Sequence, residues 1–358
     1  MAAFYFALIS SYVLSLIARI VKTKKKYPNL YFSIFVILIL ALLAGLRWGI
    51  GDTPAYVHLY SLIEPGYDPK GGYEPGFVLF LAILKGISKD PQFMIFVTAV
   101  ITTVLNLWTI RKYCKDSYFE LAVFTYIASG YYLVTMNGIR QSLAASIIFA
   151  GTSFIIKGEF KKYLFLCILM TTFHTSAFVM IPAYYVVRTE AWSKKIYQLL
   201  VLFLIGMILY EPLMEIIYKL LGNSKYADYQ NFNEGGSNIL RVIVFAVPVI
   251  LSYIKRDKLK EWTEANVFIN MSLISFLIMG FSLYNWIFAR FTIYFQIYSF
   301  VLLAYIIKKC FFGSERRLIY FGFLVCYFLF FIYEYKISLR IVYSSNFSIS
   351  KYFYYVIE

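Results

Sequence analysis

Residues 30–53 read LYFSIFVILILALLAGLRWGIGDT, and this stretch decides the fold. The run from Leu30 to Leu46 is almost entirely apolar and stops at a charged residue, Arg47. A helix of about 20 such residues crosses about 30 Å of hydrocarbon. Similar runs recur along the chain, which is 61% hydrophobic and 15% charged, whereas soluble domains are about 25% charged. The sequence therefore predicts an all-α polytopic integral membrane protein.

The basic residues predict the orientation of the chain. Lysines between 22 and 26 follow the first apolar run, and the positive-inside rule places such short basic loops in the cytoplasm. The polar loops 47–75 and 219–238 are then expected on the outer side. We expect a single transmembrane domain over residues 1–333. The Tyr-rich tail 334–358 is expected to be amphipathic and to lie in the membrane interface.

The number of crossings depends on two segments. Basic clusters at 111–115, 157–162, 255–260 and 308–317 should also be cytoplasmic, but simple alternation places some of the basic loops outside. The conflict disappears if residues 76–87 and 163–187 enter the membrane and return to the same side, which is tolerated where the backbone is buried in protein or lines a wet cavity. We expect about ten transmembrane helices plus one or two re-entrant segments. The alternative is that the charge rule fails at one or two loops.

Composition excludes several classes of function. The net charge of +15 resides in short clusters between apolar runs, so no basic face is long enough to follow a nucleic acid. The four cysteines are scattered and the chain has only two histidines, so neither a metal nor a redox spacing is visible. Motifs for binding ATP or a nicotinamide are absent. We expect no cofactor, no metal and no nucleic-acid partner.

Polar residues gather where apolar runs meet the predicted outer side. Arg47 is followed by Trp48, Asp52 and Tyr56, with glycines that permit sharp turns. An arginine at this position offers a planar fork for phosphate oxygens. The alternative is an interfacial arginine that pairs with Asp52.

Five further positions complete the set of candidates. Glu74 directly precedes Pro75, Arg140 and Gln141 enter a helix after Asn137-Gly138, His174 interrupts an apolar run, and Arg290 lies at a predicted outer boundary, as does Arg241. Charged residues in or beside membrane helices are costly and rarely accidental. Two of them have a plainer explanation: Glu74 would complement a helix dipole, and His174 would be a satisfied core residue. A tight turn would explain Asn137-Gly138 but not the entry of Arg140 and Gln141 into the next helix.

These motifs together resemble the EpsG family of Wzy-like polysaccharide polymerases. The resemblance covers about residues 1–310 and rests on the order and spacing of short motifs, which are Gly45-Leu46-Arg47, Gly51-Asp52 with Tyr56, Glu74-Pro75-Gly76, Arg140-Gln141, Phe173-His174-Thr175-Ser176-Ala177, Lys225-Tyr226 with Tyr229, and Arg290 with Tyr294. The family is thought to extend bacterial exopolysaccharide or capsule chains outside the cytoplasmic membrane.

The resemblance implies a substrate and a mechanism. Undecaprenyl-diphosphate-linked oligosaccharide repeats would serve as donor and acceptor, in a membrane shared with a flippase and a chain-length regulator. We expect a metal-independent, inverting glycosyl transfer. Arg47, Arg140 and Arg290 would hold the diphosphate, and Asp52, Glu74 or His174 would act as the base. Aromatic side chains, namely Trp48, Tyr56, Tyr226, Tyr229 and Tyr294, would line the substrate path with Gln141 and Arg241.

Two other classes of protein share the hydrophobicity. A flippase or transporter of lipid-linked oligosaccharides should show internal repeats and charges along a transmembrane path, and neither is visible. A membrane acyltransferase acting on polysaccharide would also use one histidine in an apolar setting, but its acyl-donor site should be reachable from the cytoplasm. The polar motifs gather on the other predicted side, which favours the polymerase.

Overall fold

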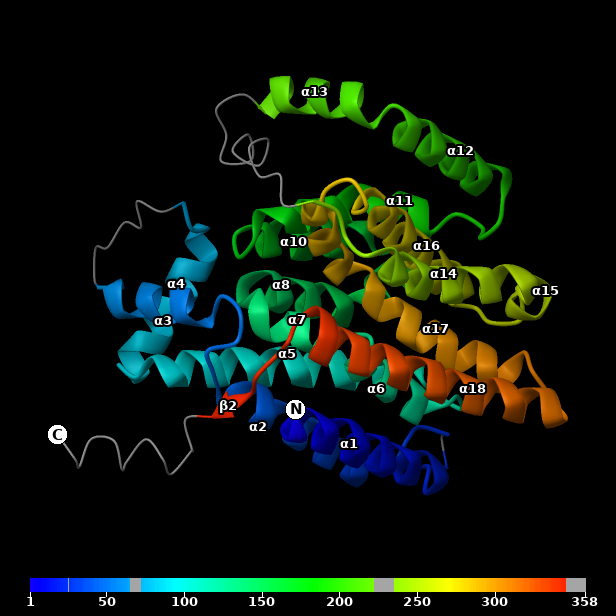
Figure 1. Ribbon diagram of the computed structural model, residues 1–358, viewed down its shortest axis with the longest axis horizontal. Coiled ribbons are helices and arrows are strands. Elements are labelled where there is room, and N and C mark those ends of the chain that lie inside the picture. The colour runs from blue at the N-terminus through cyan, green and yellow to red at the C-terminus, as the bar shows by residue number, and fades with distance from the viewer. Residues whose placement is uncertain (25, 65–71, 222–234, 346–358) are drawn as a thin grey trace. The chain divides into compact units, whose positions relative to one another are not determined.

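The computed structural model describes residues 1–24, 26–64, 72–221 and 235–345 of the 358-residue chain (Figure 1). The contacts divide the chain into two compact units. Unit 1 comprises residues 1–183 and 303–358, and unit 2 comprises residues 184–302. The chain passes between them within two helices, α11 (Met180–Val187) and α17 (Gln296–Lys309).

Both units are built almost entirely from helices. Unit 1 contains α1 (Ala2–Ile20), α2 (Leu30–Gly45), β1 (Arg47–Trp48), α3 (Thr53–Leu62), α4 (Pro75–Ile87), α5 (Pro91–Tyr113), α6 (Phe119–Ala128), α7 (Tyr131–Asn137), α8 (Ile139–Ala150), α9 (Thr152–Lys157), α10 (Phe160–Thr171), the 3-10 helix η1 (Thr175–Val179), α18 (Gly313–Ile332), the π-helical turn η4 (Tyr333–Ser338) and β2 (Ser344–Ser345). Unit 2 contains α12 (Lys194–Ile208), α13 (Tyr210–Leu221), α14 (Ile239–Ile254), α15 (Arg256–Leu259), α16 (Ala265–Phe281) and the 3-10 helix η3 (Trp286–Tyr294).

The described helices confirm a polytopic helical membrane protein but not the predicted count of about ten crossings. Three helical segments are long and apolar enough to cross a membrane, and the number rises to six if each sharply bent helix pair forms one span. Six further apolar helices have only 10–17 residues. Two of the bends were not predicted: α6 and α7 meet at 52°, and α12 and α13 meet at 88°.

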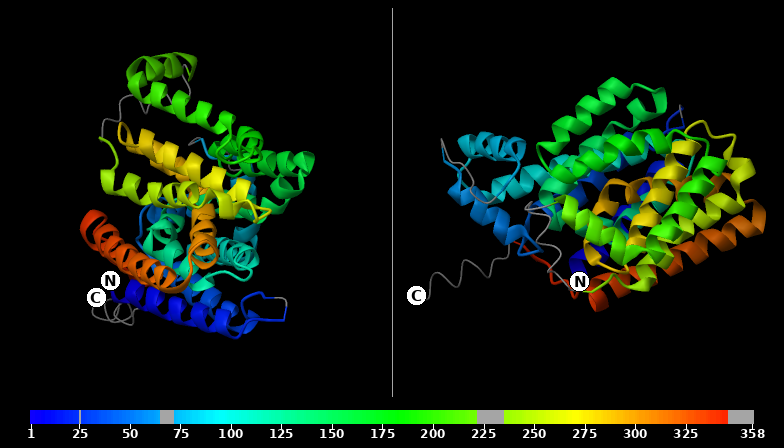
Figure 2. Two further views of the ribbon diagram at one scale, coloured as in Figure 1. Left: turned by 90° about the vertical axis from the view of Figure 1, so that its right-hand side faces the viewer. Right: turned by 90° about the horizontal axis from the view of Figure 1, so that it is seen from above.

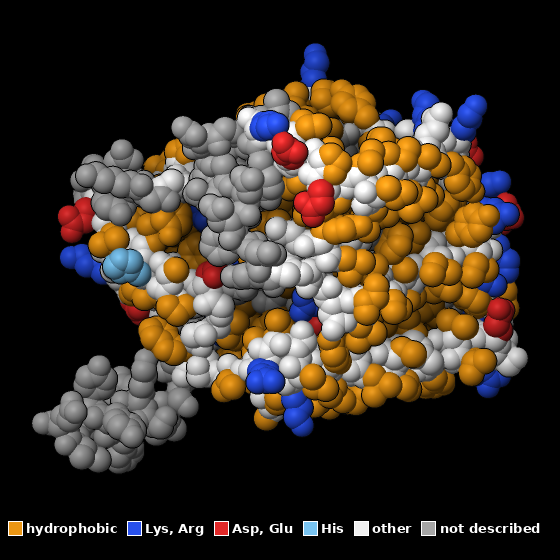
Figure 3. Space-filling view, turned by 45° about the horizontal axis from the view of Figure 1, so that its top comes forward, with side chains coloured by type: hydrophobic (Ala, Val, Ile, Leu, Met, Phe, Trp, Pro, Cys, Tyr) orange, Lys and Arg blue, Asp and Glu red, His pale blue; other side chains and the backbone are white. Residues whose placement is uncertain are grey.

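Apolar side chains cover much of the surface, as expected where helices face lipid. Figure 3 shows hydrophobic side chains over a large part of one face. Phe35 on α2 and Phe321 on α18 are among the large apolar side chains that are exposed. In water such surface would be costly to expose, whereas in a bilayer it needs no protein partner.

The antiparallel helices α2 and α5 define two opposite ends of unit 1. Helices α1, α2 and α5 pack side by side (Figures 1 and 2). The Gln92 amide at the start of α5 donates to the carbonyl of Gly45 at the end of α2 (2.6 Å), and Arg111 near the end of α5 donates to Pro28 just before α2 (2.7 Å). The 23 residues of α5 span about 35 Å at about 1.5 Å per residue. The ends are therefore well separated.

One of these ends gathers three of the basic loops. Asp116, which follows α5, accepts hydrogen bonds from Lys22 (3.1 Å) and Lys309 (2.8 Å) and forms a longer ion pair with Lys26 (3.8 Å). Partial burial opposes ionisation, but the two lysine hydrogen bonds lower the pKa of Asp116 to about 2. The loops that the charge rule places together in the cytoplasm are thus neighbours in unit 1.

A buried carboxylate adds to the packing near this end. Arg19 of α1 forms an ion pair with Glu120 of α6 (2.8 Å), whose side chain is fully buried. Tyr320 of α18 donates to the same carboxylate (3.1 Å) and lies 2.8 Å, oxygen to oxygen, from Tyr12 of α1. A buried charge is tolerated when it is paired and hydrogen-bonded, so this network fixes α1, α6 and α18 together.

The beginning of the C-terminal tail packs within unit 1. The helix of α18 continues through η4, where Tyr335 is fully buried and donates to the carbonyl of Ile127 (2.9 Å). Farther on, β2 pairs with β1 in antiparallel register, with Ser345 opposite Arg47. Residues 346–358, on which most of the predicted amphipathic tail falls, lie outside the described residues.

The two segments predicted to be re-entrant are short helical pieces. The first is α4, which begins at Pro75 and has 13 residues. The second is broken: α10 ends at Thr171, and a new 3-10 turn begins after His174. The break falls at the predicted polar interruption. Re-entry itself, and the single transmembrane domain over residues 1–333, remain predictions.

Candidate functional site

Three loop–helix junctions meet in unit 1, away from the end that gathers the basic loops. They are the start of α4 at Glu74, the start of α8 at Arg140, and the turn between α10 and η1 at His174. The core beneath them is a buried cluster that includes Tyr60 of α3, Phe77 of α4, Met94 and Ile95 of α5, and Ile139 of α8. Gly45 at the end of α2 contacts Gln92 at the start of α5, and the core cluster includes residues from the same start of α5. The three junctions therefore lie at the end of unit 1 opposite Asp116.

Glu74 and Arg140 form a buried ion pair. One carboxylate oxygen of Glu74 accepts from Arg140 Nη1, and the other accepts from the backbone N–H and the hydroxyl of Thr175 (3.1 and 3.0 Å). Burial opposes ionisation, but the guanidinium and these hydrogen bonds lower the pKa of Glu74. A carboxylate held ionised in this way positions its partners well and is a poor base.

The Arg140 guanidinium is held on three sides. Besides Glu74, it contacts the hydroxyl of Tyr56 through Nε (3.5 Å) and lies over the ring of Tyr73, 4.7 Å from its centroid. The Arg140 side chain is 20% exposed. Among the residues that the structure describes, none forms a hydrogen bond with Nη2. This nitrogen is therefore available to an anionic ligand.

A glycine allows the start of α4 to approach the His174 turn. A Cβ atom at Gly76 would lie 2.1 Å from the hydroxyl of Thr172 and 2.8 Å from its carbonyl oxygen. The backbone N–H of Phe77 donates to that same carbonyl (3.1 Å). The Glu74-Pro75-Gly76 motif thus combines a carboxylate, a helix start and a close backbone approach.

His174 caps η1 with its own ring. Nδ1 accepts from the backbone N–H of Ser176 (3.3 Å) and lies 2.6 Å from the Ser176 hydroxyl, which in turn accepts from the Gln141 amide (3.1 Å). A nitrogen that accepts from a backbone N–H carries no proton. The neutral ring therefore bears its proton on Nε2, and His174 is a donor at that atom.

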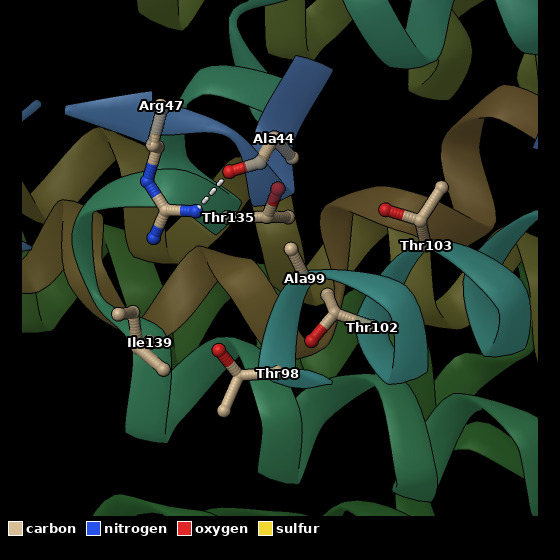
Figure 4. A pocket seen from close by; sticks show the side chains of 8 residues that line it. All are labelled: Ala44, Arg47, Thr98, Ala99, Thr102, Thr103, Thr135 and Ile139. Carbon is tan, nitrogen blue, oxygen red and sulfur yellow. Dashed lines mark hydrogen bonds between the residues drawn. The ribbon is translucent and has the colours of Figure 1, made fainter. Parts of the chain in front are cut away.

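Arg47 lies inside unit 1 and is 1% exposed. Nη1 donates to the carbonyl of Ala44 at the end of α2, and Nη2 donates to that of Met136 near the end of α7 (2.9 Å). Figure 4 shows the guanidinium beside a cavity of about 10 Å³ that threonines of α5 also line. That is the size of one water molecule and far too small for a diphosphate. Arg47 braces helix ends here, and its predicted contact with substrate stays a prediction.

Asp52 and Trp48 lie on the exposed side of the same region. Gly51 has φ +54°, and a Cβ there would lie 2.1 Å from Oδ1 of Asn137, which accepts from the Asp52 backbone N–H (2.8 Å). The Gly51-Asp52 and Asn137-Gly138 motifs therefore meet. The Asp52 side chain is exposed and has no hydrogen-bond partner among the described residues. Trp48 is 40% exposed.

The remaining candidates belong to unit 2 or fall outside the described residues. Arg290 is exposed, with its guanidinium 4.8 Å from the ring centroid of Trp286, whereas Tyr294 is buried. Arg241 lies in the first turn of α14, and the segment before α14 contacts the segment before η3, with Trp286 N–H donating to Gly235 (3.2 Å). Tyr226 and Tyr229 lie outside the described residues.

The list of site residues predicted from the sequence omits three members of this network. Thr175 and Ser176 bind Glu74 and His174 through backbone and side-chain groups, and Tyr73 stacks on Arg140. Each adjoins a predicted residue, which was the available signal. Over the described ranges, no three His, Cys, Asp or Glu side chains form a group able to hold a metal. Metal independence stays a prediction.

Comparison with known proteins gives one finding. The model of the EpsG family matches residues 29–354, essentially the whole chain. No curated protein matches the chain, and no solved structure does.

Proposed function

The chain belongs to the EpsG family, and on this premise we propose that it polymerises oligosaccharide repeats carried on a lipid diphosphate. Family membership and the apolar helices indicate a membrane enzyme of exopolysaccharide biosynthesis. The more specific proposal is a Wzy-type glycosyl transfer from an undecaprenyl-diphosphate-linked donor to a second lipid-linked repeat.

The observation that carries this proposal is the way in which neighbouring side chains hold the Arg140 guanidinium. Its guanidinium is fixed by Glu74, Tyr56 and Tyr73, while Nη2 has no partner among the described residues. A preorganised arginine stabilises charge that develops on a departing phosphate. The His174 turn is fixed to the same Glu74 carboxylate through Thr175, so a second polar donor is held in the same network.

In the reaction, the acceptor hydroxyl attacks the anomeric carbon of the donor. The new C–O bond forms as the bond to the diphosphate breaks, and the lipid diphosphate leaves with the electron pair. Arg140 and the Nε2–H of His174 stabilise the departing oxygens. Asp52 takes the proton of the acceptor, because its carboxylate is exposed and accepts no hydrogen bond from the described residues. Both carboxylate oxygens of Glu74, by contrast, already accept hydrogen bonds from Arg140 and Thr175. A single displacement of this kind inverts the anomeric configuration.

We place this chemistry on the outer side of the cytoplasmic membrane. Asp116 gathers three basic loops at one end of α5, and the Arg140 network lies at the other. Since short basic loops face the cytoplasm, the network then faces outward. A flippase would supply the repeats there, and a chain-length regulator would be a further partner.

The test uses purified full-length protein in detergent with a lipid-diphosphate-linked repeat. A ladder of lipid-linked glycans of increasing length supports the proposal. In sealed vesicles, transfer of the repeat across the bilayer without any increase in glycan length would instead support a flippase. Retained anomeric configuration at the new linkage would contradict the single displacement.

A further inference from the structure

Unit 2 contains a cavity of about 500 Å³ that lies wholly within that unit. Its walls come from the loop before α12, the first turn of α12, and the segment from α15 to the start of α16. This volume is within the range of small-ligand sites. The residues that matter for its chemistry are Trp192, Tyr197, Arg256, Lys260, Trp262 and Asn266, with Glu190 as the acidic member.

Two asparagines of α16 hold the loop that forms one wall. Oδ1 of Asn266 accepts from the backbone N–H of Ala191 (2.9 Å), and the amide of Asn270 donates to the carbonyl of Thr189 (2.9 Å). The Asn270 side chain is fully buried. The wall is therefore a fixed part of unit 2.

Trp192 is the unusual residue of this wall. Its φ of +60° lies in the left-handed region, which bulky residues rarely adopt. Its ring packs edge-on against Tyr253 (5.0 Å between centroids). The indole Nε1–H is buried and has no hydrogen-bond partner among the described residues. A buried donor left unpaired is costly, so the wall of the cavity holds a strained residue with an unsatisfied polar atom.

The cavity and its surroundings are cationic. Arg256 and Lys260 outnumber Glu190 among the charged lining residues. Arg256 donates one N–H to the carbonyl of Tyr253 (3.1 Å) and stacks on that ring. Among the described residues, Lys260 forms only an exposed ion pair with Asp257 (3.4 Å). Both retain further donors. Two cations with further donors at one cavity suit phosphate oxygens.

The cavity also marks the point where exposed apolar helix surface gives way to charge. Beyond Tyr197, α12 exposes Val201 and Leu202, and just before Arg256, α14 exposes Ile250 and Ile254. Tryptophan and tyrosine are enriched at membrane–water interfaces, and basic pockets beside membrane helices bind anionic headgroups. A lipid could place its acyl chains on the apolar faces and its phosphate in the cavity.

We propose that this cavity binds the phosphate-bearing headgroup of an anionic phospholipid, with Arg256 and Lys260 on the phosphate oxygens. The basic loop 255–260 is expected on the cytoplasmic side, so this site is distinct from the Arg140 network. It does not depend on the proposed glycosyl transfer.

The experiment titrates delipidated full-length protein in detergent with phosphatidylglycerol or phosphatidylcholine and counts bound lipids by native mass spectrometry. We expect tighter binding of phosphatidylglycerol. The double variant Arg256→Gln/Lys260→Gln should weaken its binding by about 10- to 30-fold, given the usual contribution of a cation near the membrane surface.

The matched control is Lys194→Gln/Lys195→Gln, which removes the same charge from exposed residues outside the lining. It should bind phosphatidylglycerol like the wild type. An excess of inorganic phosphate should not displace the lipid; full displacement would show a soluble-anion site and overturn the lipid assignment. Equal binding of the two lipids, or equal losses in lining and control variants, would overturn the proposal. Thermal melting of each variant identifies any that fail to fold.

Discussion

The carboxylate of Glu74 accepts a hydrogen bond from Arg140 with one oxygen and from Thr175 with the other. These three residues come from three separate helix starts. One side chain therefore fixes both the guanidinium that would bind a diphosphate and the turn that presents His174. The geometry of the candidate site depends on this pair.

The Glu74–Arg140 pair should show strong coupling in stability. Because the pair is largely buried, removing one partner leaves the other charge uncompensated. We expect Glu74→Gln and Arg140→Gln each to lower the stability of the detergent-solubilised protein, and the double variant to lose less than the sum. The coupling free energy should be about 1–3 kcal/mol, measured from thermal or denaturant unfolding of the four proteins.

The exposed pair Glu215–Lys219, with side chains 67% and 74% exposed, provides the control. The same cycle there should give no measurable coupling, since exposed ion pairs contribute little. Additive losses at Glu74 and Arg140 would contradict the pairing.

Gly76 should not tolerate a methyl group, whereas Gly86 in the same helix should. A Cβ at Gly76 meets the backbone oxygen of Thr172 at 2.8 Å, whereas one at Gly86 meets nothing within 4 Å. We expect Gly76→Ala to destabilise the protein by about 1–3 kcal/mol and to reduce activity by moving the His174 turn. Gly86→Ala should be neutral or slightly stabilising. Equal melting temperatures for the two variants would rule out the close approach.

The basic end of unit 1 should lose stability in acid. Lys309 and Lys22 lower the pKa of Asp116 to about 2, against about 3.9 in an unfolded chain. A lowered pKa gives stability that is present above the unfolded value and disappears as the pH falls toward the folded one. The difference in melting temperature between wild type and Asp116→Asn should therefore be largest near neutral pH and shrink between about pH 4 and pH 2.

Asp257, which is 79% exposed, serves as the control for this titration. Asp257→Asn should match the wild type at every pH. If the melting temperature of Asp116→Asn stays below that of the wild type by the same amount down to pH 2, the carboxylate does not act through its charge.

The two ends of unit 1 should label from opposite sides of the membrane. Ala55, on α3 next to the Gly51–Asn137 contact, and Lys24, in the first basic loop, are both exposed. In a Cys326→Ser background, which removes the exposed native cysteine, a membrane-impermeant maleimide should label Ala55→Cys in intact cells. It should label Lys24→Cys only after permeabilisation. Labelling of both from one side would refute the proposed orientation.

The sequence predicted helix positions well where apolar runs are bounded by clear signals. The run after Asn29 was predicted to begin at Leu30, and α2 does so with Asn29 as its cap. The segment after Glu74 was predicted to begin a helix at Pro75, and α4 does. Local chemistry decides such boundaries, because a cap or a proline acts within one turn.

The bends were not predicted, and the partners could not be predicted from local signals. The bend between α12 and α13 lies at Leu209, and Gly206 and Pro212, each within one turn of it, were a signal that the prediction did not use. Glu74 and Arg140 are 66 positions apart, and nothing local indicates that they pair. Arg47 was predicted to hold phosphate, a contact that stays a prediction; in the fold its two terminal nitrogens donate to the carbonyls of Ala44 and Met136, which the sequence did not indicate. Tertiary packing decides which polar groups stay available.

The most direct measurement compares glycan polymerisation by wild type, His174→Asn and His58→Asn. Asn285 caps η3 by accepting from Ile287 N–H at backbone angles close to those of His174, with φ −147° against −155°. Asparagine at 174 should therefore keep the cap and the fold while removing the Nε2 donor. His58 is exposed on α3 and is the only other histidine in the chain. With purified proteins of equal melting temperature, we predict a ladder from wild type and His58→Asn, and a rate lowered by about 100-fold or more in His174→Asn. A ladder of wild-type length and rate from folded His174→Asn would contradict the assignment of this site.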